Sequence, residues 1–119
     1  MLSNEIIQQV EHEIASALTA RKDGFEGRAR VIARRAVAIA ITSWMEGKLG
    51  NRQSVLSVLA EFQSLDIPED IQLATSHLLQ RVNAQHCLDE GIDLLVDART
   101  ILAYCQSTDY FSTTEKNVD

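Results

Sequence analysis

The sequence is poor in the residues that interrupt helices or favour strands. It has one proline, five glycines and 5% aromatic residues in 119 positions. Because proline and glycine break helices and aromatic residues favour strands, their scarcity favours a helical fold over a turn-rich β architecture. An apolar content of 45% and a charged content of 24% are ordinary for a globular chain, which excludes wholesale disorder.

Cysteine is also scarce, since Cys87 and Cys105 are the only two. They form neither a Cys-x-x-Cys pair nor a cluster with histidine, so the sequence predicts no metal site and offers no motif for a cofactor. The Glu-x-x-His spacing of di-iron helical bundles is absent as well. Both cysteines are interpreted as small apolar side chains of a reducing compartment.

Long apolar runs are missing. The longest segment without charge, 36–45, is shorter than the roughly 20 residues that a membrane-spanning helix needs. The first 18 residues form an acidic amphipathic pattern and lack the basic and apolar regions of a signal peptide. We therefore expect a cytoplasmic protein without a membrane segment.

The net charge is −6, which argues against a general nucleic-acid binder. Positive charge is nevertheless concentrated in one segment, RARVIARRAVAIAITSWM at 28–45. On a helical wheel, its alanines at 29, 33, 36 and 40 fall within an arc of roughly 60°, opposite the arginines. This pattern predicts a helix that packs closely against another helix through its alanine face.

The arginines of this segment are a candidate anion-binding site: Arg28, Arg30, Arg34 and Arg35. Guanidinium groups match phosphate oxygens bidentately, which suits RNA phosphate or a small anionic ligand. The alternative is a set of ion pairs with acids that share one face of a later helix, namely Glu90, Asp93 and Asp97. We favour the ion pairs, because such pairs are common and need no ligand.

The end of the same segment carries apolar or small groups around nearly the whole wheel. A surface helix in a small bundle keeps a polar stripe, so this helix is either surrounded by the rest of the chain or covered by a second subunit. We favour a homodimer whose interface includes Ile41, Trp44 and Met45, since tryptophan and methionine are enriched at interfaces.

Apolar periodicity and capping residues predict five helices, at about 3–20, 28–46, 52–64, 68–82 and 92–104. The fold class is therefore all-α, an up-and-down four-helix bundle with one additional short helix. Residues 1–106 form a single helical-bundle domain. Residues 107–119 have no helical period and are expected to form a flexible C-terminal tail.

A second candidate site pairs Arg81 with His86. Such a pair could act on an RNA phosphodiester, with the arginine holding the phosphate and the histidine acting as general acid or base. An arginine followed within a few residues by a histidine is also expected by chance in a chain with eight arginines and three histidines. In the alternative interpretation, Arg81 lies near a helix C-terminus and His86 in a solvated loop.

Three segments resemble the HEPN superfamily of small prokaryotic helical bundles: GRARVIARRAVAIAI at 27–41, LLQRV at 78–82 and IDLLVDARTIL at 92–102. The resemblance implies an up-and-down bundle that is usually a dimer. In many members it also implies a metal-independent endoribonuclease or an RNA-binding partner of a nucleotidyltransferase. The ribonuclease motif of the family would here be Arg81 and His86.

The chain departs from that motif at Val82, where the family usually has a polar residue. We therefore expect a non-catalytic HEPN-like interaction module that is homodimeric and acts through a protein partner, such as a nucleotidyltransferase. The alternative is a metal-independent endoribonuclease or RNA-binding protein that uses Arg81 and His86.

Overall fold

The computed structural model describes residues 2–45, 54–80 and 91–110, and this part of the chain is helical without strands. The all-α prediction is confirmed. The described helices run in the order α1 (Asn4–Lys22), α2 (Glu26–Trp44), α3 (Val55–Gln63), α4 (Glu69–Leu79) and α5 (Leu94–Ser107).

Side-chain caps fix where three of these helices begin. The Ser3 hydroxyl accepts a hydrogen bond from the Ile6 amide, and the Ser54 hydroxyl accepts one from the Ser57 amide. Asp93 caps α5 in the same way. Each cap satisfies an amide that has no partner inside its helix. The first helix was therefore predicted correctly from Ser3, whereas the third begins three residues later than expected.

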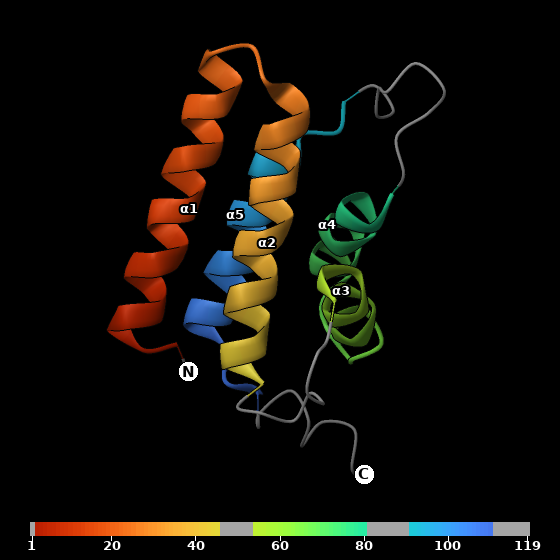
Figure 1. Ribbon diagram of the computed structural model, residues 1–119. Coiled ribbons are helices and arrows are strands. Elements are labelled where there is room, and N and C mark those ends of the chain that lie inside the picture. Colours follow the sequence, from red (N-terminus) through yellow and green to blue (C-terminus); the bar gives the residue numbers. More distant parts are fainter. Residues whose placement is uncertain (1, 46–53, 81–90, 111–119) are drawn as a thin grey trace, which may run out of the picture.

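The turn between α1 and α2 is only three residues long. Gly24 has a φ of +87°, a left-handed conformation that glycine adopts without steric cost. The Phe25 amide then donates to the Ala20 carbonyl over 2.8 Å, which closes the end of α1. The chain reverses here, so α1 and α2 lie side by side as an antiparallel pair (Figure 1). Phe25, the last residue of this turn, is exposed.

Helix α2 is the centre of the arrangement. It packs against α1, α3 and α5, while α4 packs against α3 and α5. Figure 1 shows α3 and α4 together on one side of α2, with α5 behind it. The alanine face forms the close-packing seam that the sequence predicts, because its four members are fully buried: Ala29, Ala33, Ala36 and Ala40.

An aromatic cluster surrounds Trp44 at the end of α2. The Trp44 ring lies 5.5 Å from the ring of Phe62 on α3 and 5.2 Å from that of Tyr110. Its indole Nε1 donates a hydrogen bond of 2.6 Å to the Thr108 carbonyl. The elements of a single chain thus enclose this side chain on several sides.

This cluster changes the interpretation of Ile41, Trp44 and Met45 as interface residues. Their side chains are 0%, 0% and 3% exposed within the single chain. Of the two explanations for the apolar end of α2, burial inside the chain is the one observed, since neighbouring helices cover a central helix. A homodimer would have to use other, exposed residues.

The folded domain also extends further than predicted. Ser107 is the last residue of α5, and Thr108 and Tyr110 contact Trp44. These three residues were expected in the flexible tail 107–119, and here they are part of α5 or in contact with Trp44. Residues 111–119 lie outside the described part of the chain.

Candidate functional site

The predicted catalytic pair cannot be placed, because Arg81 and His86 both lie outside the described residues. Glu90, one of the acids expected to pair with the α2 arginines, lies outside them too. Within the described residues, no three histidine, cysteine, aspartate or glutamate side chains gather as metal ligands would. None of the described helices is both long and apolar enough to span a membrane.

Arg34 is partly buried and contacts the end of α4. Its Nε donates to the Leu78 carbonyl over 2.9 Å and its Nη2 to the Gln80 carbonyl over 3.4 Å. These carbonyls belong to the last turn of α4, where a cation is favoured. Burial lowers the pKa of Arg34, and the nearby charge of Arg30 lowers that pKa further. Arg34 therefore carries a half-buried positive charge, and the acceptors of its hydrogen bonds are neutral backbone carbonyls.

The other α2 arginines face in different directions. Arg35 forms an ion pair of 3.1 Å with Glu13 on α1, and Arg30 lies 3.7 Å from Glu26 on its own helix. Arg28 is exposed beside the open side of the α1–α2 pair. The four arginines thus do not converge on one point, and the predicted anion site is not brought together as a single cluster.

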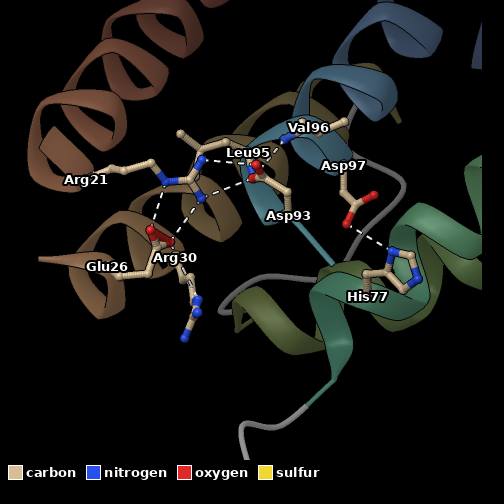
Figure 2. A network of polar contacts seen from close by, with 8 residues as sticks. All are labelled: Arg21, Glu26, Arg30, His77, Asp93, Leu95, Val96 and Asp97. Atoms are coloured by element: carbon tan, nitrogen blue, oxygen red, sulfur yellow. Dashed lines mark hydrogen bonds and ion pairs between the residues drawn. The ribbon is translucent and has the colours of Figure 1, made fainter. Parts of the chain in front are cut away.

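The α5 acids have partners other than those expected. Asp93 accepts hydrogen bonds of 3.0 and 3.1 Å from Arg21 at the end of α1 (Figure 2). Arg21 also donates to Glu26 over 2.8 and 3.0 Å. These bonds raise the pKa of Arg21, and the bond from Arg21 is the main reason that the pKa of Asp93 is lowered. The expected pairing of Asp93 with the α2 arginines is replaced by a pairing with Arg21.

Asp97 contacts a histidine instead of an arginine. One of its carboxylate oxygens lies 3.0 Å from Nδ1 of His77 on α4 (Figure 2). Burial raises the pKa of Asp97, while the hydrogen bond from His77 opposes that rise. The pair joins α4 to α5.

Two adjoining hollows follow α2 on the side of α3 and α4. The first has a volume of about 590 Å³ and lies between Val31, Leu56 and the end of α4 at Leu78–Gln80. The second has a volume of about 380 Å³ and runs along Ala38, Ile39 and Thr42, between Ile6 of α1 and Val58 of α3. Arg35 and Val55 border both. We refer to the two together as the α2–α3–α4 groove.

The groove exposes apolar side chains that a packed core would cover. Val31 is 58% exposed and Leu56 is 52% exposed. Val31 was overlooked among the arginines, although its place outside the alanine arc was a signal that it faces away from the seam.

A third hollow of about 600 Å³ lies between α1 and α2, with Arg28, Phe25 and His12 along it. It also contains Glu13 and Asp23, so its lining carries charges of both signs. This mixture makes it less suited to an anion than the arginines alone would indicate.

Comparisons with protein-family models, with curated proteins and with solved structures gave no match.

Proposed function

We propose that this chain is a non-catalytic helical interaction module that acts by binding a partner protein. The observation that supports it best is the α2–α3–α4 groove, where Val31 and Leu56 are exposed beside two arginines. Contiguous exposed apolar surface is unfavourable in water and, on soluble proteins, often marks an interaction site. HEPN-like membership and the up-and-down four-helix arrangement are part of the same proposal.

The proposal includes a homodimer, for which a second surface is available. Leu18 on α1 and Val96 on α5 are exposed. Along their helices they lie between two ion pairs that join α1 to α5, Arg21 with Asp93 and Arg99 with Glu11. A surface with apolar side chains and charges of both signs can be complementary to a copy of itself, as a two-fold interface requires.

The partner proposal is tested by photo-crosslinking in the native host. A photoreactive amino acid replaces Leu56 in the groove, and in a matched control it replaces Val96, which is 61% exposed on α5. We expect a defined partner protein, identified by mass spectrometry, to be captured from position 56, whereas position 96, in the proposed dimer surface, captures only a second copy of this chain. The capture is lost when Val31→Asp is added, because a carboxylate at that position disrupts the apolar surface. The same products from both positions, or none from position 56, would contradict the proposal.

The dimer is tested with the purified protein by sedimentation over a range of concentrations. Val96→Asp is expected to shift the equilibrium to monomer, whereas Val31→Asp leaves it unchanged. A monomeric wild-type protein at all concentrations would remove the dimer from the proposal without affecting the groove.

The alternative function is a metal-independent endoribonuclease that uses Arg81 and His86. Its support is the spacing of these residues in the sequence and the chemistry that such a pair performs. Single-stranded RNA cleaved in the presence of a chelator, with cleavage lost in His86→Ala, would favour it. Intact RNA under the same conditions would exclude it.

A further inference from the structure

The groove has the length of a short helix. Val31, Arg35, Ile39 and Thr42 follow one another along its α2 side. Val31 and Thr42 are 11 residues apart in the sequence, which is about 16 Å or three helical turns. The other borders are formed by α3 along both hollows, by the end of α4 at the first hollow and by Ile6 of α1 at the second. A groove of this length between helices matches the footprint of an amphipathic helix with apolar side chains at i, i+4 and i+7.

The charged side chains that border the groove in the described residues are both positive, Arg34 and Arg35. Arg34 directs its hydrogen bonds to backbone carbonyls, so no carboxylate of the described residues neutralises it. Arg35 pairs with Glu13, yet its side chain is 54% exposed. No acidic residue borders either hollow of the groove in the described part of the chain. A partner that placed carboxylates beside these arginines would form charge-assisted hydrogen bonds, which are stronger than bonds between neutral groups.

We propose that the groove binds an acidic amphipathic helix of a partner protein, with apolar side chains against Val31 and Leu56 and carboxylates against Arg34 and Arg35. This inference rests on the proposed function and states the chemistry of the partner. The apolar floor distinguishes this site from a phosphate-binding surface, where cations and polar groups follow the backbone.

The probes are three stapled helical peptides of about 14 residues, which exceed the groove length of about 16 Å. All three carry leucine at i, i+4 and i+7, and the flanking positions hold glutamate, glutamine or lysine. They are titrated into the full-length protein with labelled methyl groups. The methyl signals of Val31, Leu56 and Ile39 report on the groove, and those of Leu18 and Val96 serve as the internal control.

We expect the glutamate peptide to shift the groove signals alone and to bind about 10-fold more tightly than the lysine peptide at low salt. Molar salt reduces that ratio towards one, because exposed charges are screened. Arg35→Gln weakens binding of the glutamate peptide several-fold and leaves the glutamine peptide unchanged. Arg34→Gln is expected to act in the same way. Arg99→Gln on α5, outside the groove, is the matched control and changes neither affinity.

Several results would overturn the inference. Equal or tighter binding of the lysine or glutamine peptide at the groove refutes the acidic partner, while the interaction module itself stands. If the groove signals shift with protein concentration in the absence of any peptide, the groove binds a second copy of the chain. Shifts of the same signals by a short single-stranded RNA assign it to nucleic acid. If none of the three peptides moves the groove signals, the helical partner is refuted, and crosslinking at position 56 separately decides the proposed function.

Discussion

Arg21 and Asp93 are joined by two hydrogen bonds although 72 residues separate them in the sequence. The same Asp93 carboxylate accepts bonds from the amides of Leu95 and Val96 over 3.0 and 3.4 Å. The Asp93 side chain thus caps the N-terminus of α5 and also links this helix to the end of α1. A residue that serves two elements is expected to affect stability more than an ordinary surface charge.

The first prediction concerns stability in acid. The pKa of Asp93 lies below its usual value near 3.8, so the unfolded state binds more protons between the two values. Stability from this carboxylate is therefore fully present above about pH 5 and is lost as the pH falls through the lowered pKa. Asp93→Asn should cost up to about 1 kcal/mol at neutral pH and flatten the decline in acid. Urea unfolding from pH 2 to 6 measures both effects.

The control for this prediction is Asp66→Asn, since Asp66 is exposed and precedes α4. Its stability curve should run parallel to that of the wild type. Asp93→Ser keeps a capping hydroxyl and removes the charge, so it separates the cap from the ion pair. An acid decline in Asp93→Asn as steep as in the wild type would contradict the role given to this carboxylate.

The second prediction concerns the alanine seam of α2. Ala36 is fully buried among the neighbouring helices, so Ala36→Leu adds volume that the seam cannot accept. We expect the free energy of unfolding to fall by about 1–3 kcal/mol. The same substitution at Ala60, which is exposed on α3, is the matched control and should change stability by less than about 0.5 kcal/mol. A loss of stability in Ala36→Leu as small as the one expected at Ala60 would show that the seam is loosely packed.

The third prediction uses Trp44, the only tryptophan of the chain. Because its side chain is fully buried, its fluorescence should be blue-shifted and resistant to iodide. Trp44→Phe removes the donor to the Thr108 carbonyl and leaves a gap, at a cost of about 2–3 kcal/mol. Phe25→Leu, at an exposed aromatic position, is expected to be nearly neutral. Strong quenching of the wild-type protein by iodide would disprove the enclosure of Trp44.

The fourth prediction concerns Cys105. Burial raises the pKa of its thiol to about 12, so the reactive thiolate is scarce at neutral pH. In a Cys87→Ser variant, where Cys105 is the sole thiol, a thiol reagent should react only after unfolding in urea. Rapid labelling of the native variant would show that α5 opens readily.

Features that depend on neighbouring residues in the sequence could be predicted. The start of α1 at Ser3 and the alanine seam follow from capping chemistry and helical periodicity. The periodicity of α3 was recognised too, but its start was placed early, because Ser54 is one of several polar residues that could cap it.

Features that depend on residues far apart in the sequence could not be predicted. Periodicity shows that the end of α2 is apolar, but it does not show whether Tyr104 and Phe62 or a second subunit cover Trp44. The partners of the charged side chains could not be predicted for the same reason. A sequence lists the acids and the arginines, whereas the packing of α1 against α5 decides that Asp93 meets Arg21. The bond from Arg34 to a backbone carbonyl has no sequence signal at all, because every residue carries such a carbonyl.

The hydrogen bond from Trp44 to Thr108 also sets an order of events during synthesis. Thr108 is made 64 residues after Trp44, which corresponds to roughly 3–13 seconds of translation. The α1–α2 pair can form during that interval from contacts that are close in sequence. The indole, however, receives its last neighbours only when the end of α5 has left the ribosome. A chain that stops before Thr108 therefore presents an open aromatic surface to the quality-control machinery of the cell, and the completed chain conceals it.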